Sequence, residues 1–139
     1  MARKIREVMT ADPLAVGPQT SVVEVARLMR DEDIGAVLVT EGGQLRGLVT
    51  DRDLVVRVLC RGGNAEDHSV ADACSAEVVS VTPDDDIRRA VDLMRRHALR
   101  RLPVVEEGRP VGIVSLGDLA VERDTDSALS EISAADPNE

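Results

Sequence analysis

Two short stretches of the sequence carry a hydroxyl group followed three residues later by a carboxylate. Thr50 precedes Asp53 in GLVTDRDL, and Ser115 precedes Asp118 in GIVSLGDL. At a helix start, the hydroxyl can donate to a phosphate, and the carboxylate can accept from both hydroxyls of a ribose. The same spacing is that of a helix capping box, in which both side chains bond to backbone N–H groups. Nucleotide binding and capping are compatible roles, and the spacing fits either.

Each motif also has a glycine three residues before its hydroxyl. Gly47 and Gly112 lie inside predicted strands, where glycine lowers stability and leaves a gap in the side-chain packing. Capping requires no glycine at this place. We therefore expect either a ligand or another backbone segment to approach closely at both positions.

The motif occurs twice because the sequence contains an internal repeat. An offset of 65 residues aligns residues 5–55 with residues 70–120 without a gap. The two copies share Leu-Met-Arg at residues 28–30 and 93–95, together with glycines and prolines spread along their length. Such repetition indicates two copies of one supersecondary unit.

Both copies have the same order of predicted elements. A short β-prone run ends at a proline-containing break, a helix with apolar residues at helical spacing follows, and two strands joined by a glycine-containing turn lead into a last helix. The order is strand, helix, strand, strand, helix, and neither copy is large enough to bury its faces alone. We therefore predict an α+β fold. The predicted elements before the last helix cover residues 14–16, 22–29, 36–40 and 45–49 in the first copy and residues 78–81, 87–94, 102–105 and 110–114 in the second.

The predicted helices of the two copies start with different side chains. Thr20 or Ser21 can cap the helix of the first copy. Asp84, Asp85 and Asp86 are expected in the first turn of the second copy's helix, where the helix dipole favours negative charge. The acidic run is thus explained as a helix start without a metal ion.

This organisation resembles the CBS domain, a family that commonly occurs as tandem pairs called Bateman modules. The resemblance rests on GLVTDRDL, GIVSLGDL, the RRLPVV of residues 100–105 and the opening IREVMT. It implies two repeats packed around a pseudo-twofold axis. Residues 1–61 would form the first repeat, residues 62–69 a linker, residues 70–123 the second repeat, and residues 124–139 an acidic, mobile tail.

The resemblance also implies a regulatory ligand-binding module. In the family, the Thr or Ser of the motif lies near phosphate and the Asp binds ribose. The resemblance implies AMP, ADP, ATP or S-adenosylmethionine as the ligand, with NAD or a cyclic dinucleotide as further alternatives. No cofactor is required. The predicted ligand-binding residues are Gly47, Thr50, Asp53, Arg100, Arg101, Gly112, Ser115 and Asp118.

The two copies differ where a phosphate would be held. Arg100 and Arg101 of the second copy align with Gly35 and Ala36 of the first. Arginine binds phosphate through its forked donors, although on so acidic a protein a salt bridge to a carboxylate is the plain alternative. If a pseudo-twofold axis sets each copy opposite the other, the arginines face the Asp53 cleft. The sequence then predicts that the Asp53 cleft holds phosphate better.

Composition argues against several other classes of protein. The formal net charge is −9, from 26 acidic and 17 basic residues, which repels nucleic-acid backbones. The sequence has no Phe, Tyr or Trp on which bases could stack. Because no apolar run reaches the length of a membrane span or signal peptide, we expect a cytoplasmic protein with no membrane partner.

Catalysis and metal binding have little support. His68 and His97 lie in a polar linker and at a helix end, where solvated or capping histidines are common. Cys60 and Cys74 do not have zinc-site spacing with His68, so we expect two reduced thiols. We therefore predict no catalytic residue, no metal site and no enzyme activity.

Dimerisation is expected instead. Helix 51–61 is predicted to carry Leu54, Val55, Val58 and Leu59 on one side, more apolar surface than a solvated helix needs. Stand-alone CBS pairs that this chain resembles include bacterial stress and dormancy proteins, so an unknown regulated protein is a further expected partner. The alternative to a nucleotide sensor is a ligand-free, dimeric interaction scaffold.

Overall fold

The computed structural model describes residues 3–75 and 78–123, which form two compact units. The β3–β4 unit contains described residues 14–75 and 78, and the β5–β6 unit contains described residues 3–13 and 79–123. The predicted α+β class is confirmed, and both repeats show the order helix, strand, strand, helix, with a short leading strand (Ala15–Val16) in the first. The acidic segment 124–139, expected to be a mobile tail, lies outside the described residues.

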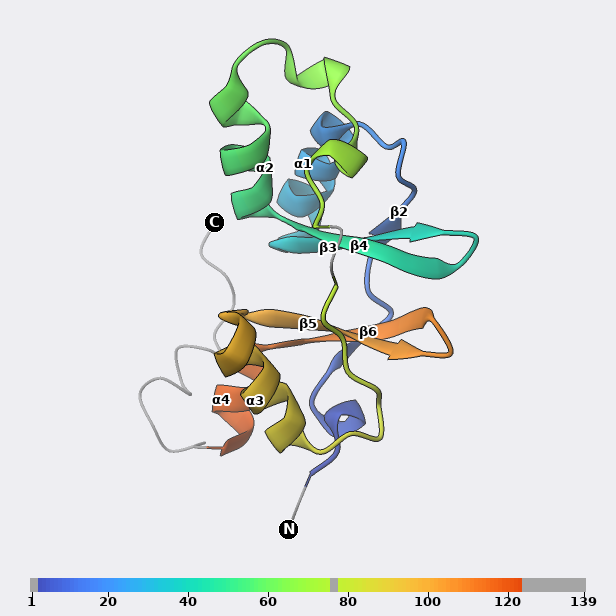
Figure 1. Cartoon of the computed structure of the whole chain (residues 1–139), viewed down its shortest axis with the longest axis vertical. Helices are drawn as coiled ribbons and strands as arrows, with labels where there is room; N and C mark the ends of the chain where they lie inside the picture. The colour runs from blue at the N-terminus through green and yellow to red at the C-terminus, as the bar shows by residue number, and fades with distance from the viewer. Residues whose placement is uncertain (1–2, 76–77, 124–139) are drawn as a thin grey trace. The chain divides into compact units, whose positions relative to one another are not determined.

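The β3–β4 unit is built on a three-stranded sheet in the order β2-β3-β4 (Figure 1). The strand β2 is parallel to β3, and β3 and β4 form an antiparallel hairpin. Both helices of the unit, α1 and α2, lie on one face of this sheet, and Val25, Val37 and Val49 are fully buried between the layers (Figure 1). The bounds are β2 Ala15–Val16, α1 Val22–Glu32, β3 Ala36–Glu41, β4 Gln44–Thr50 and α2 Asp51–Arg57.

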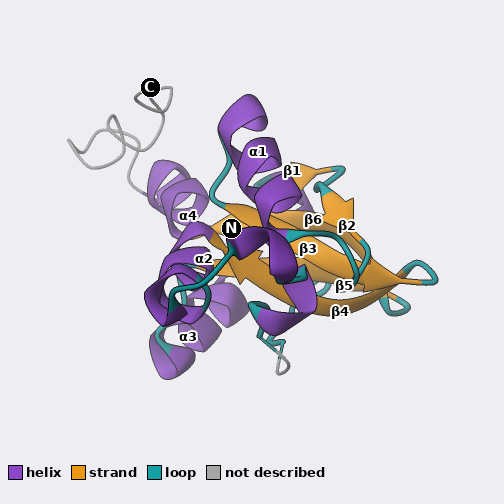
Figure 2. Cartoon of the chain, turned by 90° about the horizontal axis from the view of Figure 1, so that it is seen from above, coloured by secondary structure: helices purple, strands orange, loops and turns teal. Residues whose placement is uncertain are grey.

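The β5–β6 unit repeats this plan with a different third strand. Its sheet has the order β1-β6-β5, in which β1 is antiparallel to β6 (Figure 2). The predicted strand 78–81 is reduced to a single parallel bridge between Val81 and Val104. Ile5, Leu102 and Val114 are fully buried in the aliphatic core. The bounds are β1 Thr10–Ala11, α3 Ile87–His97, β5 Arg101–Glu106, β6 Arg109–Ser115 and α4 Leu116–Arg123.

The segments that lead into the two repeats are exchanged between the units. Residues 5–11, the first lead-in segment, contain the 3₁₀ helix η1 (Ile5–Glu7) and pack in the β5–β6 unit. Residues 70–75, the second lead-in segment, contain the 3₁₀ helix η4 (Val70–Asp72) and pack in the β3–β4 unit. Each compact unit is therefore completed by a segment from the other sequence repeat. Two further 3₁₀ helices, η2 (Leu59–Arg61) and η3 (Ala65–Asp67), lie between α2 and η4.

The observed start of α1 agrees with the prediction from the sequence, whereas the observed start of α3 differs from it. Ser21 caps α1, because its Oγ accepts from the N–H of Val23 at 3.0 Å. Asp86 caps α3, so the expectation that it lies in the first turn was wrong. Asp85 precedes the helix and accepts from the N–H of Thr82. Asp84 and Asp85 therefore precede α3 and Asp86 caps it, so none of the three lies in the first turn.

The helix predicted over residues 51–61 is interrupted. The helix α2 ends at Arg57, and the chain forms the 3₁₀ helix η2 from Leu59. Leu54 and Val58 are buried, whereas Val55 is 53% and Leu59 is 61% exposed. The four apolar residues expected on one side are thus divided between the core and the surface.

Candidate functional site

A complete capping box starts α2 at the first motif. The Oγ1 atom of Thr50 accepts from the N–H of Asp53 at 3.1 Å, and Oδ2 of Asp53 accepts from the N–H of Thr50 at 2.8 Å. The other carboxylate oxygen, Oδ1, lies 3.6 Å from Nε of Arg57. Both oxygens of Asp53 therefore have partners within their own helix.

The second motif forms the same box at the start of α4. The Oγ atom of Ser115 accepts from the N–H of Asp118 at 3.1 Å, and Oδ2 of Asp118 accepts from the N–H of Ser115 at 2.9 Å. Capping is therefore confirmed at both motifs. A cap of this kind contributes about 1 kcal/mol to stability, so it accounts for the residue types at both positions without a ligand.

The remaining N–H groups distinguish the two helix starts. At α2, the N–H of Asp51 donates to O of Gly35 at 3.0 Å, and the N–H of Arg52 donates to Oδ1 of Asp51 at 2.8 Å. At α4, the N–H of Leu116 donates to O of Arg100 at 2.8 Å. Gly117, which aligns with Arg52, has no acceptor for its N–H among residues 3–75 and 78–123. The first turn of α4 is therefore more open than that of α2.

The two glycines are explained by close approach of another backbone segment. A methyl group at Gly47 would lie 2.9 Å from Sγ of Cys74 and 3.1 Å from O of Ser75. A methyl group at Gly112 would lie 2.6 Å from Sδ of Met9 and 2.9 Å from O of Thr10. Of the two explanations offered by the sequence, the lead-in segments therefore supply the neighbour at both positions.

The signal for this contact was present in the repeat. Met9 aligns with Cys74, and Thr10 aligns with Ser75, at the same offset of 65 residues that relates the glycines. Thr10 pairs with Ile113 on β6, next to Gly112, and Ser75 bridges to Leu48 on β4, next to Gly47. The repeat thus contained both contacting partners, although sequence reasoning did not connect them.

The two predicted phosphate-binding arginines lie beside the second motif. Arg101 is directly opposite Ser115 in the ladder of β5 and β6, and O of Arg100 accepts from the first N–H of α4. Arg100 is exposed and Arg101 is half-buried. No carboxylate within the described ranges forms an ion pair with either guanidinium. The backbone of both arginines therefore lies beside the start of α4 within the β5–β6 unit.

The cysteines and histidines do not gather into one site. Cys60 is exposed, and Cys74 is half-buried under β4, where burial raises the pKa of its thiol. Nδ1 of His68 lies 3.6 Å from Oδ2 of Asp72. Across the part of the chain that the structure describes, no three side chains of His, Cys, Asp or Glu lie close enough to hold a metal ion. Across the same ranges, no helix has both the length and the apolar character needed to cross a membrane.

Comparisons with known proteins agree with this geometry. The CBS-domain family model matches residues 5–59 and 70–123. The CBS domain-containing protein YhcV of Bacillus subtilis is 38% identical over 133 residues, which cover 93% of this chain and 94% of YhcV.

Solved structures share the fold. The crystal structure of Hypoxic Response Protein I with two coordinated zinc ions has a TM-score of 0.77 at 30% identity, covering 86% of this chain and 98% of that one. The CBS domain pair of MJ0100, in complex with 5′-methylthioadenosine and S-adenosyl-L-methionine, has a TM-score of 0.75 at 19% identity, covering 85% and 97% of the two chains. With both repeats matched, the chain belongs to the CBS-domain family and carries two CBS domains in tandem.

Proposed function

We propose that this CBS pair is a non-catalytic regulatory module that binds an adenine nucleotide or adenosyl ligand at its two motifs and signals through rearrangement of a dimer or a partner protein. We place it in the cytoplasm, where its two free thiols would stay reduced. The observation that carries the proposal is the open first turn of α4, bordered by Arg100 and Arg101.

The start of α4 offers the groups that a phosphate requires. The N–H of Gly117 is available there, and the positive end of the helix dipole favours an anion. The guanidinium groups of Arg100 and Arg101 can add charge-assisted hydrogen bonds. Asp118 uses Oδ2 for capping, which leaves Oδ1 to accept from the hydroxyls of a ribose. These groups together suit a phosphorylated adenosine.

The start of α2 suits a ligand without phosphate. Its first N–H groups are satisfied internally, and Asp51 adds a negative charge where a phosphate would approach. The sequence predicted that the Asp53 cleft would hold phosphate better. The geometry within each unit supports the opposite assignment, with phosphate near Ser115 and an adenosyl group without phosphate near Asp53.

The known relatives give limited support to this ligand class. The MJ0100 chain in complex with adenosyl ligands is only 19% identical to this one. It therefore supports the compatibility of the fold with such ligands, but it does not support the assignment of individual binding residues. Hypoxic Response Protein I supports a role in a stress response. Its zinc ions are not carried over, because the described residues of this chain bring no three metal-binding side chains together.

A ligand-free scaffold is the second candidate function, and a specific observation favours it. Val55, Val56 and Leu59 expose about half or more of their surface on α2 and η2. Because these side chains are already about half buried, covering the rest of each with a second copy would contribute about 0.7–1.5 kcal/mol per residue, roughly half the value for a fully exposed side chain. A dimer is part of both proposals, so ligand binding must distinguish them.

The absence of aromatic residues makes that test direct. Without Trp or Tyr the protein absorbs very little near 280 nm, so an absorption maximum near 260 nm in purified protein would report a bound nucleobase. We expect AMP, ATP or S-adenosylmethionine to raise the melting temperature, since a ligand at 100 times its Kd stabilises the fold by about 2.7 kcal/mol. A sample with no nucleobase absorption and no thermal shift with any of the three would favour the scaffold.

A further inference from the structure

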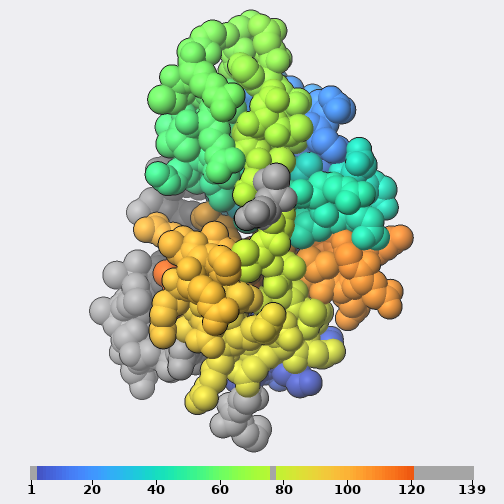
Figure 3. Space-filling model, viewed as in Figure 1, coloured from blue at the N-terminus to red at the C-terminus, as the bar shows by residue number. Residues whose placement is uncertain are grey.

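The outer surface of α3 is basic in a protein that is otherwise acidic. Four arginines and one aspartate lie between Ile87 and His97, whereas the whole chain has a net charge of −9. Figure 3 shows this surface in yellow and amber. Arg88, Asp92 and Arg95 are exposed on it. The helix therefore presents a local positive charge that the net charge of the chain does not predict.

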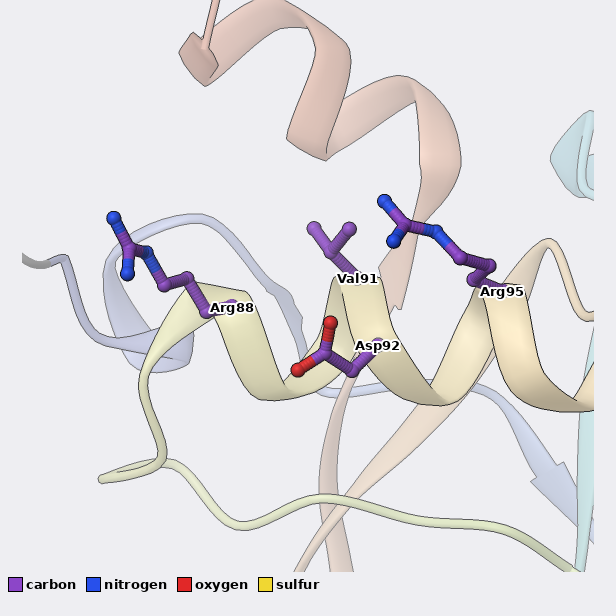
Figure 4. Close-up of a pocket in the computed structure, with 4 residues that line it drawn as sticks. All are labelled: Arg88, Val91, Asp92 and Arg95. Carbon is purple, nitrogen blue, oxygen red and sulfur yellow. The ribbon is translucent and has the colours of Figure 1, made fainter.

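Two of these arginines border an open notch. Arg88 and Arg95 stand on either side of Val91 and Asp92, and the four side chains line the notch (Figure 4). Val91 is half-buried against the core of the β5–β6 unit, so it forms an apolar floor. Asp92 offsets part of the positive charge. The notch thus combines two guanidinium groups with a small apolar surface.

The arginines of the notch have no strong partner among the described residues. Arg89, their neighbour, has Nε 3.5 Å from Oδ2 of Asp85. By contrast, no acidic side chain within residues 3–75 and 78–123 forms an ion pair with Arg88 or Arg95. Arginine is the side chain best suited to bidentate contact with carboxylates. The two guanidinium groups are therefore available to an acidic segment.

The chain itself supplies such a segment directly after α4 in the sequence. Residues 124–139 contain five acidic residues and no basic one, with Leu129 and Ile132 three positions apart. This segment continues from Arg123, the last residue of α4, and α4 packs against α3. Sixteen residues can span up to about 55 Å, whereas an eleven-residue helix is only about 17 Å long. Residues 124–139 therefore have both the charge and the length needed to contact the notch.

We propose that residues 124–139 bind the notch of Arg88, Val91, Asp92 and Arg95 within the same chain. The carboxylates of the segment contact Arg88 and Arg95, and Leu129 or Ile132 covers Val91. The contact masks the basic surface of α3 and makes its exposure dependent on ionic strength and on competing anionic partners. This proposal is independent of ligand binding at the two motifs.

NMR of the full-length chain tests the contact from both sides. The first variant neutralises the segment with Asp124→Asn, Asp126→Asn, Glu131→Gln, Asp136→Asn and Glu139→Gln. We expect it to shift the Nε–H resonances of Arg88 and Arg95 and to leave those of Arg27 and Arg30 on α1 unchanged. A matched control, with Ser127→Asn, Ser130→Asn and Ser133→Asn, keeps every charge and should leave the arginine resonances in place.

The reciprocal variant changes the notch. Arg88→Gln with Arg95→Gln should shift the amide resonances of Leu129 and Ile132, whereas Arg27→Gln with Arg30→Gln should not. About 1 M salt, which shortens the Debye length to about 3 Å, should shift the wild-type resonances towards those of the neutralised variant. The amides of β5 and β6 verify that each variant is folded. Unchanged resonances in both variants would overturn the proposal, as would shifts that occur only at high protein concentration, since these would assign the contact to another copy.

Discussion

Arg101 lies directly opposite Ser115 in the antiparallel ladder of β5 and β6. This pairing sets a basic side chain beside the residue that caps α4, while the equivalent pair in the other unit is Ala36 and Thr50. Two repeats with the same fold therefore surround equivalent hydroxyls with different charges. The chemical difference between the motifs arises from the strand beside each helix start as much as from the motif itself.

The first prediction concerns ligand binding at the second motif. Asp118→Asn should weaken AMP binding by about 1.5–3 kcal/mol, the range for a hydrogen bond to a charged group, because it removes the carboxylate proposed to accept from ribose. Asp53→Asn should have a smaller effect on AMP. Isothermal titration calorimetry measures both, after denaturant unfolding has shown that each variant keeps its fold. Loss of AMP binding in Asp53→Asn, with binding retained in Asp118→Asn, would instead assign the AMP site to the first motif.

The second prediction concerns the glycines under the lead-in segments. Gly112→Ala should destabilise the protein by about 1–3 kcal/mol, because overpacking against Met9 and the carbonyl of Thr10 forces the backbone to shift. Gly47→Ala should act in the same direction against Cys74 and Ser75. Urea unfolding provides the free energies.

Gly17 offers a matched control for these substitutions. A methyl group there would meet nothing within 4 Å, so Gly17→Ala should change stability by less than about 0.5 kcal/mol. Equal stability of all three variants would show that the lead-in segments do not pack against the glycines.

The third prediction concerns the ion pair that attaches the first lead-in segment to the turn before α3. Nη2 of Arg6 lies 2.6 Å from Oδ1 of Asp84, and the hydrogen bond from Arg6 lowers the pKa of Asp84 from its ordinary value of 3.8. Since the folded-state pKa is the lower one, the stabilisation is fully present above pH 3.8 and is lost as the pH falls through the folded-state value.

NMR titration of the Asp84 carboxyl carbon checks this effect. Arg6→Gln should raise the pKa of Asp84 towards 3.8 by removing its main cause, whereas Arg30→Gln should leave Asp84 unchanged and raise the pKa of Asp31 instead. Because both partners are solvent-exposed, the change in unfolding free energy should be small. A pKa of Asp84 that is the same with and without Arg6 would contradict the pairing.

The fourth prediction concerns the exposed apolar residues of α2 and η2. Leu59→Asp should convert a dimer to a monomer, because it would place a charge on a side chain that is 61% exposed in one chain and is proposed to be covered in the pair. Light scattering at micromolar concentration measures the mass. Leu14→Asp, at another exposed apolar position, is the control and should leave the dimer intact. A wild-type protein with monomer mass would remove the basis of this prediction.

The sequence alone determined the repeat and the local chemistry of the motifs. The 65-residue offset fixed the element order, because helical and strand periodicities are local properties that the chain displays twice. The capping boxes were predictable for the same reason, since Thr50 and Asp53 are three residues apart and interact within one turn. The division of buried Leu54 and Val58 from exposed Val55 and Leu59 was missed, because it depends on how much of the helix surface the rest of the unit covers.

Tertiary structure decided the features that join distant segments. The glycines could accommodate a ligand or a backbone, and only the exchange of lead-in segments shows that Met9 and Cys74 lie over them. The open N–H of Gly117 likewise depends on which carbonyls and side chains reach the first turn of α4. Contacts between residues such as Thr10 and Ile113 leave no periodic trace in a sequence, because periodicity reports the apolar face of a single element and not its partner. Periodicity therefore indicates which elements form, whereas packing selects which of them meet.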